Sequence, residues 1–194
     1  MPRSERRLEK IKRVLQRRQP DLTVVMENIH DPHNVSAVLR SCDAVGVMRV
    51  ELLYNVEKFP RIGKKSSSSA NKWLQCRRHK TVAECYDRLR AEGFTIYATH
   101  LASDAVSLFD LDLTQKVALV FGNEHRGVSD EAAKLADGNF IIPMVGMIQS
   151  LNISVACAVS LYEAMRQRLA AGAYNTPKLS PDELRSLVEA WLTL

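Results

Sequence analysis

The sequence predicts an α/β protein with one parallel sheet and helices on both of its faces. The first observation is a regular alternation of short apolar runs with helical patterns, which is typical of such a sheet. The second is size, because 194 residues, 46% of them hydrophobic, can bury one domain with short appendages. We expect that domain over residues 21–172, flanked by an N-terminal extension over 1–20 and a C-terminal extension over 173–194.

Six short strands and four helices alternate along the predicted domain. The strand-like runs are residues 22–26, 49–53, 74–76, 95–99, 117–121 and 140–142. The helical patterns are residues 35–45, 81–92, 129–136 and 153–171. Basic residues 1–18 are expected to form a further helix. A last helix should run from about Asp182 to Leu192, because Ser180 suits an N-cap and Pro181 suits the first helical position.

The composition argues against a membrane protein, an exported protein and a metal site. No apolar run reaches the roughly 18 residues of a membrane span, and the basic N-terminus lacks the apolar part of a signal peptide. The cysteines form no CxxC pair, and no His, Cys and carboxylate cluster has metal-ligand spacing. We expect a cytoplasmic protein without a metal, whose cysteines are buried free thiols: Cys42, Cys76, Cys85 and Cys157.

Two segments carry the basic character of the chain. Residues 1–18 hold eight Lys or Arg against two acids, and residues 58–80 hold eight with no acid. On a helix, the first segment places its cations on one stripe: Arg6, Lys10, Arg13 and Arg17. The second contains a glycine and four consecutive serines, which predict a loop. Both segments favour nucleic acid as partner; a membrane surface and ordinary surface charge are the alternatives.

Residues 139–158 form an apolar run interrupted by polar side chains: Gln149, Ser150, Asn152 and Ser154. The run begins as a strand, stops at Pro143 and resumes with helical spacing after Asn152. Loops between a strand and a helix are where α/β sheets bind ligands, and polar groups buried there need partners. On the residues alone, a ligand-binding loop and a helix capped by Asn152 or Ser150 are equally good interpretations.

The segment DPHNVSAVLR, residues 31–40, follows a strand and opens a helix. Asn34 is a natural N-cap, and Arg40 lies nearly two turns further on, close to the same helix face. Arg40 is either a surface residue with a salt-bridge partner or a site residue with its stem packed and its head in a cleft. We favour the site, because the fixed fork of guanidinium donors suits a phosphate.

The segment VFGNEHRG, residues 120–127, leaves a strand through Gly122 and returns to a helix after Gly127. The two glycines allow a ligand or another backbone to come close at the C-terminal end of a strand. With Glu124 between them, the segment is either a site or an ordinary exposed turn, and on this segment alone the ordinary turn is the better interpretation. Neither GxGxxG nor GxxxxGK(S/T) occurs, so Rossmann dinucleotide and P-loop sites lose their main support.

Three segments in this order, PHNVSAVLR, LVFGNEHRGVS and IPMVGMIQSLNISVA, resemble the three motifs of the SpoU class of SPOUT RNA methyltransferases. The flanks RRQPDLTVVMENIHDPHN, ATHL and YEAMRQRLAAGAY resemble the tRNA guanosine 2′-O-methyltransferases of that class. The resemblance covers nearly the whole chain. It implies a deep C-terminal trefoil knot in the α/β domain, S-adenosylmethionine (SAM) as cofactor, tRNA as partner and a homodimer. General topology rules would count the knot as improbable.

The resemblance also implies roles for single residues. Backbone and apolar groups near six positions would hold SAM: Thr99, Leu101, Gly122, Ile142, Met144 and Leu151. Five residues match catalytic or site-building positions: Asn34, Arg40, Glu124, Ser150 and Asn152. Six match positions implicated in gripping tRNA: Arg7, Lys10, Arg18, His33, Arg166 and Arg168. One departure precedes Trp73, where related proteins tend to have glycine and this chain has Ser68, Ser69 and Ala70.

The implied reaction is methylation of the ribose 2′-hydroxyl of guanosine 18 in the tRNA D-loop. The methyl group of SAM is already activated on a sulfonium, so neither a metal nor a covalent enzyme intermediate is required. The hydroxyl is a weak nucleophile until it loses its proton. Because a guanidinium stays protonated, we expect Arg40 to anchor a phosphate and stabilise alkoxide charge rather than act as the base. Glu124, Ser150 and Asn152 would orient Arg40, which would complete a site in the partner subunit.

Two rival functions stay open at this point. A sister enzyme that methylates ribosomal RNA or another tRNA position would share the three motifs, although many such relatives add a separate N-terminal RNA-binding domain. A non-enzymatic RNA-binding module would bind RNA with strong salt dependence and would not bind SAM. The residues do not distinguish an enzyme for all tRNAs from one for a subset, since that depends on the folded RNA shape.

Overall fold

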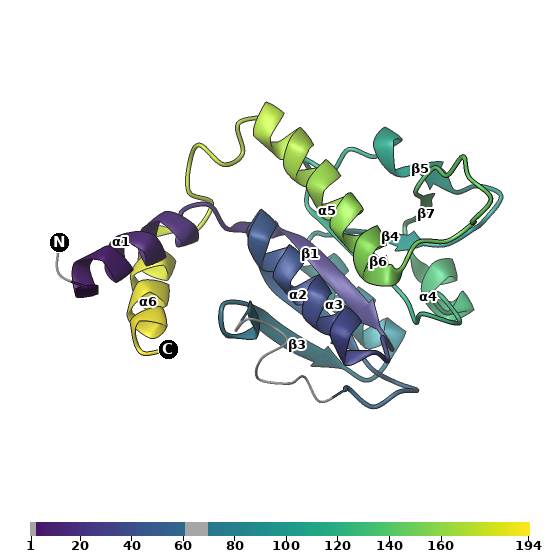
Figure 1. Ribbon diagram of the computed structural model, residues 1–194, viewed down its shortest axis with the longest axis horizontal. Helices are drawn as coiled ribbons and strands as arrows, with labels where there is room; N and C mark the ends of the chain where they lie inside the picture. Colours follow the sequence, from purple (N-terminus) through teal and green to yellow (C-terminus); the bar gives the residue numbers. More distant parts are fainter. Residues whose placement is uncertain (1–2, 61–69) are drawn as a thin grey trace.

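The computed structural model describes residues 3–60 and 70–194. Seven strands form one sheet in the order β3-β2-β1-β6-β4-β7-β5, and every neighbouring pair is parallel (Figure 1). In chain order the strands are β1 (Gln19–Glu27), β2 (Val47–Leu53), β3 (Gln75–His79), β4 (Thr95–Thr99), β5 (Val106–Ser107), β6 (Val117–Phe121) and β7 (Gly138–Ile141). The α/β fold with a parallel sheet is confirmed. The two-residue strand β5 was not predicted, and the trefoil knot stays a prediction.

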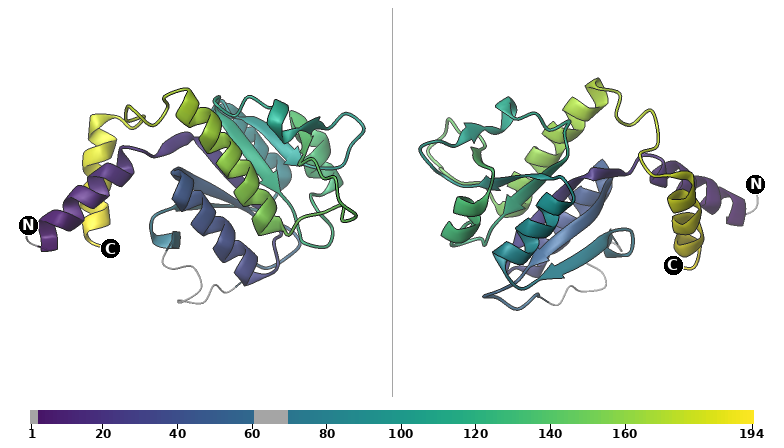
Figure 2. Two further views of the ribbon diagram at one scale, coloured as in Figure 1. Left: turned by 45° about the horizontal axis from the view of Figure 1, so that its top comes forward. Right: turned by 180° about the vertical axis from the view of Figure 1, so that it is seen from behind.

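Helices cover both faces of the sheet, as the alternating pattern predicts. The α-helices are α1 (Arg3–Leu15), α2 (Pro32–Val45), α3 (Val82–Ala91), α4 (Asp130–Leu135), α5 (Ile153–Ala170) and α6 (Pro181–Leu192). Two short 3₁₀ helices, η1 (Ala70–Lys72) and η2 (Leu108–Asp110), lie in the connections. Helices α2 and α5 lie side by side on one face, and α3 and α4 lie on the other (Figures 1 and 2).

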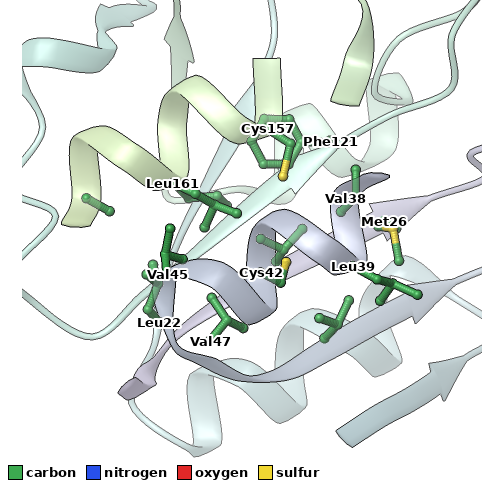
Figure 3. Packing of buried hydrophobic residues seen from close by; sticks show 14 of the residues in the cluster. Leu22, Met26, Val38, Leu39, Cys42, Val45, Val47, Phe121, Cys157 and Leu161 are labelled. Carbon is green, nitrogen blue, oxygen red and sulfur yellow. The ribbon is translucent and has the colours of Figure 1, made fainter. Parts of the chain in front are cut away.

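The larger hydrophobic core lies between the sheet and the pair α2 and α5. Figure 3 shows Cys42 of α2 close to Cys157 and Leu161 of α5, with Phe121 of β6 next to Cys157. Both helices follow parallel strands, so both begin at the edge of the sheet where those strands end. The packing of α2 on α5 therefore places the two helix starts, with the motifs they carry, at the same edge.

The start of α2 differs from the prediction. Asp31, not Asn34, is the N-cap, because its carboxylate accepts a hydrogen bond of 2.8 Å from the backbone N–H of His33. Pro32 occupies the first turn, where its missing N–H costs nothing. Since the cap is supplied three residues earlier, the Asn34 side chain is available for another use.

Helices α1 and α6 pack against each other to one side of the sheet (Figures 1 and 2). Ile11 and Leu15 of α1 and Trp191 of α6 are buried there. Helix α6 begins as predicted, with Ser180 in a capping box with Glu183. The domain boundaries that the sequence suggests at residues 21 and 172 stay predictions.

Several composition-based expectations can be compared with the described residues. Cys42, Cys85 and Cys157 are buried free thiols, whereas Cys76 is exposed on the edge strand β3, which corrects the expectation for that residue. Within residues 3–60 and 70–194, no helix is long and apolar enough to cross a membrane. The same residues contain no group of three His, Cys, Asp or Glu that could hold a metal ion. Part of the predicted basic loop, including Ser68 and Ser69, lies outside the described residues.

Candidate active site

A polar cluster joins the three sequence motifs at the starts of α2 and α5. The carboxylate of Glu124 accepts hydrogen bonds from the Asn34 side chain at 2.9 Å and from the backbone N–H groups of His30 and Asp31 at 3.0 and 3.1 Å. The Asn34 side chain in turn accepts a bond of 3.1 Å from the Asn152 amide. Asn34 and Asn152 are 118 positions apart in the chain. The cluster therefore depends on the fold and could not form from any one motif.

Glu124 is held as a carboxylate by this cluster. Partial burial by itself raises the pKa of Glu124, but the hydrogen bonds from Asn34 and from the two backbone N–H groups outweigh it, so its pKa lies below the ordinary range. All of these bonds donate to the carboxylate and therefore favour the ionised form. Glu124 is suited to hold Asn34 and the loop before α2 in place, and it is a poor proton acceptor near neutral pH.

The turn that carries Glu124 is tight because of its two glycines. A Cβ atom on Gly122 would lie 2.1 Å from the backbone of Gly127, a distance that no side chain tolerates. Gly127 has a φ of +71°, which favours glycine. Asn123 and Gly127 exchange backbone hydrogen bonds of 2.9 and 2.8 Å, and the Asn123 amide donates to the carbonyl of Asn28. Gly122 thus shapes the turn and does not line the cavity described next.

A cavity of about 480 Å³ lies at the ends of β4 and β7. Five of the six residues predicted near the cofactor line it, together with Ser150: Thr99, Leu101, Ile142, Met144 and Leu151. Gly146, Ile148 and Gln149 also line it, and they belong to the loop that the sequence offered as a ligand-binding loop. Sequence reasoning missed four other lining residues: His100, Phe140, Ile141 and Ala156. His100 follows directly after a strand in a parallel sheet, and that position was the available signal for it.

The cavity fits a nucleoside-type cofactor in size and chemistry. Its volume lies within the ordinary range of small-molecule sites, and most of its wall is apolar, with a few polar groups. Gly146 leaves open space beside the backbone, since nothing lies within 4 Å of a Cβ placed on it. Its lining includes no Asp, Glu, Lys or Arg side chain, so uncharged side chains and backbone groups must recognise the ligand.

Asn152 has two roles that the sequence left as alternatives. Its side-chain oxygen accepts a bond of 2.9 Å from the backbone N–H of Ser154, so it caps α5. Its amide nitrogen donates to Asn34 in the polar cluster. The neighbouring residues Ser150 and Leu151 line the cavity. Asn152 is therefore the N-cap of α5, and the loop just before it lines the cavity, so the two interpretations are compatible.

Arg40 lies on the exposed surface of α2, outside the polar cluster. It borders a second pocket of about 310 Å³ with Ala37 and Ser41 of the same helix and Tyr162 of α5. Among the described residues, no carboxylate forms an ion pair with its guanidinium. Within residues 3–60 and 70–194, Arg40 therefore lacks the surface salt bridge that was the alternative to a site role.

Four of the six residues predicted to grip tRNA are exposed: Arg7, Lys10, His33 and Arg166. Arg166 is already paired with Glu163 through two bonds of 2.8 Å. The other two, Arg18 and Arg168, are fully buried, which differs from the prediction. A buried guanidinium whose donors are bonded within the fold has no surface with which to contact RNA.

Arg168 ties together segments at the other end of the sheet. Its guanidinium donates to the carbonyls of Leu113, Gln115 and Asp21 and to the side chains of Gln19 and Asp21. The Asp21 carboxylate, 2.5 Å from Arg168, offsets its charge. Burial raises the pKa of Asp21, but a hydrogen bond from Lys178 and the charge of Arg168 together outweigh this effect. The pKa of Asp21 therefore lies below its ordinary value. Arg168 is therefore a structural residue.

Arg18 has a similar position next to the helices α1 and α6. It donates to the carbonyls of Val47 and Trp73 and to the Asp43 carboxylate. Its guanidinium carbon lies 5.2 Å from the centre of the Trp191 ring. These contacts join the start of β1 to α2, the turn before β3 and α6. Its predicted contact with tRNA is replaced by contacts within the fold.

Comparison with known proteins agrees with this geometry. The family model of the SpoU rRNA methylase family matches residues 21–162. The chain is 48% identical to the tRNA (guanosine(18)-2′-O)-methyltransferase of Thermus thermophilus over 98% of this chain and 97% of that protein.

Two solved structures extend the comparison. The A. aeolicus TrmH/SpoU tRNA modifying enzyme superposes with a TM-score of 0.91 at 38% identity, over 98% of this chain and 96% of that one. The SpoU methyltransferase AviRb from Streptomyces viridochromogenes, solved with the cofactor AdoMet, has a TM-score of 0.67 at 30% identity, over 80% of this chain and 59% of that one. The family match and the full-length relatives together show that this chain belongs to the SpoU methylase family.

Proposed function

We propose that this protein is a SAM-dependent methyltransferase that methylates the 2′-hydroxyl of guanosine 18 in tRNA. The observation that carries the proposal is the joining of Asn34, Glu124 and Asn152, from three separate motifs, next to the loop that lines the cavity. The relative from T. thermophilus, whose name states this reaction, matches along essentially its whole length. The cytoplasm is the proposed location, because tRNA is the proposed substrate.

SAM is the proposed occupant of the 480 Å³ cavity. When bound, it supplies a methyl group that is already activated for transfer. The residues of this chain provide shape and exclusion of water, because Leu101, Ile142 and Leu151 give the cavity apolar walls. AviRb, a family member of 30% identity, was solved with this cofactor, which supports the same class of ligand here.

Arg40 is proposed to bind the phosphate next to the target ribose. Its guanidinium is free of ion pairs among the described residues, and its planar fork suits two phosphate oxygens at once. Positive charge fixed there also stabilises the negative charge that develops on the ribose oxygen. The proton leaves to phosphate or solvent, because neither Arg40 nor the low-pKa Glu124 is a good acceptor near neutral pH.

A homodimer is proposed because α5 exposes apolar side chains along one stripe. Val155, Tyr162 and Leu169 are 47%, 56% and 54% exposed and recur every seven residues, which places them on one helix face. Val145 and Met147 in the nearby loop are almost fully exposed. Several large apolar side chains exposed on one face are typical of a protein interface. Tyr162 also borders the Arg40 pocket, so a partner covering this stripe would lie beside Arg40.

The activity test uses purified protein, labelled SAM and an unmodified tRNA transcript. The expected product is 2′-O-methylguanosine, and a transcript with adenosine in place of guanosine 18 should accept no label. A ribosomal RNA fragment is the control for the sister-enzyme alternative. Label in the ribosomal fragment and none in tRNA would replace the proposal with that alternative. RNA binding without binding of SAM would favour a non-enzymatic module.

The dimer has its own test, in which two inactive variants are mixed. Arg40→Ala removes the phosphate contact, and Gly146→Trp fills the cavity where the backbone leaves open space. If each site takes Arg40 from one subunit and its cofactor cavity from the other, co-refolded mixtures regain activity that neither variant has. A mixture as inactive as its components, with dimers present in sedimentation, would show that the two residues act within one subunit.

A further inference from the structure

We propose that a pocket between α1, α6 and the turn before β3 takes one unstacked nucleotide of the RNA substrate. The inference rests on the proposed function, because it names a further contact of the same RNA. The pocket has a volume of about 310 Å³. That is near the lower limit of small-molecule sites, so it suits a single base and not a helical segment.

Aromatic surface forms one wall of this pocket. Trp73 and Trp191 lie with their ring centres 4.9 Å apart and their planes tilted by 58°. Trp191 is 7% exposed and is covered by the Arg18 guanidinium, whereas Trp73 is partly exposed. Proteins bind single-stranded RNA by stacking its bases on such rings. Trp73 is therefore the ring on which a base can stack, and Trp191 supports it from behind.

Positive charge lies at the same pocket. Arg7 and Lys10, one helical turn apart on α1, both line it, and neither forms an ion pair with a carboxylate among the residues the structure describes. Asp43 is the acid in the pocket, and its carboxylate is bonded to Arg18 at 2.5 Å. The local balance thus favours an anion, and the phosphate of a nucleotide meets it at Arg7 and Lys10.

Arg18 holds the lining of this pocket in place. Its side chain is fully buried, and its guanidinium donates to the carbonyls of Val47 and Trp73 and to the Asp43 carboxylate. These bonds fix the backbone of Trp73 and offset the charge of the acid in the pocket. Base stacking on Trp73 and phosphate at Arg7 and Lys10 together match the parts of one nucleotide.

The chain offers a direct signal for binding, because its only two tryptophans are Trp73 and Trp191. Tryptophan fluorescence therefore reports on this pocket alone. Titration with a short single-stranded RNA should quench it to saturation, and Trp191→Phe, which leaves Trp73 as the reporter, should keep the quench. Inorganic phosphate at equal ionic strength is the control and should quench little. Unchanged fluorescence with single-stranded RNA, in a preparation that methylates tRNA, overturns the proposal.

Matched variants test the same pocket in catalysis. Trp73→Leu and Lys10→Ala should raise the KM for tRNA by about tenfold, the size expected for one stacked base or one phosphate contact, with kcat unchanged. Lys10→Ala should also leave the melting temperature unchanged, whereas Trp73→Leu lowers it because the ring packs on Trp191. Lys12→Ala removes the same charge two residues away, beside Leu184 in a different groove, and should leave KM unchanged. Equal KM values for Lys10→Ala, Lys12→Ala and wild type overturn the proposal. If wild type methylates no tRNA while single-stranded RNA still quenches, the proposed function fails and the pocket stands.

Discussion

Arg168 and Arg40 show two opposite uses of the same side chain. Arg168 is fully buried at the end of the sheet where β1 begins, with its donors bonded to carbonyls and to Asp21. Arg40 lies on the exposed surface of α2 without an ion pair among the described residues. The sequence resemblance gave both a part in handling RNA. The difference teaches that a basic residue at a matching position can serve the fold or the substrate, and that burial distinguishes the two.

The largest effect is expected from removing the buried arginine. Arg168→Ala leaves several carbonyls and the Asp21 carboxylate without their donor, so unfolding should become easier by about 3–5 kcal/mol. Chemical denaturation measures this directly. The control is Arg166→Ala, two residues away and exposed, which should leave stability unchanged. A stable Arg168→Ala protein with weakened tRNA binding would return Arg168 to the RNA-contacting residues.

Substitution of the exposed Arg40 should lower the rate of catalysis and leave the stability unchanged. Arg40→Lys keeps the charge but loses the fork, so kcat is expected to fall by about 100-fold, the size typical for loss of one donor to a developing oxyanion. The melting temperature should not change, because Arg40 makes no ion pair within the described part of the fold. Single-turnover methylation with saturating SAM is the measurement. Nearly normal turnover would refute the two-pronged contact with phosphate.

A smaller effect is expected at the acid that pairs with Arg168. Asp21→Asn should destabilise the fold by about 2 kcal/mol near neutral pH, because Arg168 and Lys178 lose a charged acceptor. The pKa of Asp21 is lower in the folded protein than its unfolded value of about 3.9. The stabilisation is therefore complete above that value and is lost as the pH falls through the folded-state pKa. Unfolding curves of wild type and variant should converge in acid, and a constant gap at every pH would contradict this.

The smallest effect is expected at Arg166. This side chain is exposed, and its charge is already offset by Glu163 through two hydrogen bonds. If it contacts a phosphate, Arg166→Ala should weaken binding of all tRNAs alike and reduce the slope of log affinity against log salt by about 1. Filter binding over a salt series gives that slope. An unchanged slope would show that Arg166 contacts no phosphate, in contrast to the role proposed for Arg40.

The general arrangement of this fold could be read from the sequence, because alternating apolar runs and helical patterns specify a parallel sheet. The start of α2 differs from the predicted cap at Asn34 for a local reason. Asn34 is a good cap by residue type, but Asp31 followed by Pro32 is the stronger signal, since proline favours the first helical turn. The Asp31-Pro32 dipeptide thus predicts a cap that leaves Asn34 free for the polar cluster.

The buried arginines illustrate what a sequence shows only in part. Cys157, Leu161, Ala164 and Arg168 recur at spacings of four, three and four on α5, which places Arg168 on the buried face. Burial could thus be predicted, but its partners could not, because the acceptors come from β1 and from the loop before β6. The same limit holds for the cavity, whose walls come from β4, β7 and the loop before α5.

The packing of α1 against α6 has a practical consequence for experiments. Helix α1 is the first helix of the chain and α6 is the last, so both ends of the described chain belong to this pair (Figure 1). An affinity tag on either end would therefore lie beside the helices that line the pocket of Arg7, Lys10 and Trp191. A polyhistidine tag adds charge there, and a fused domain adds bulk. Measurements of RNA affinity are best made on tag-free protein, and a fluorophore attached at either end would report on events at the same surface.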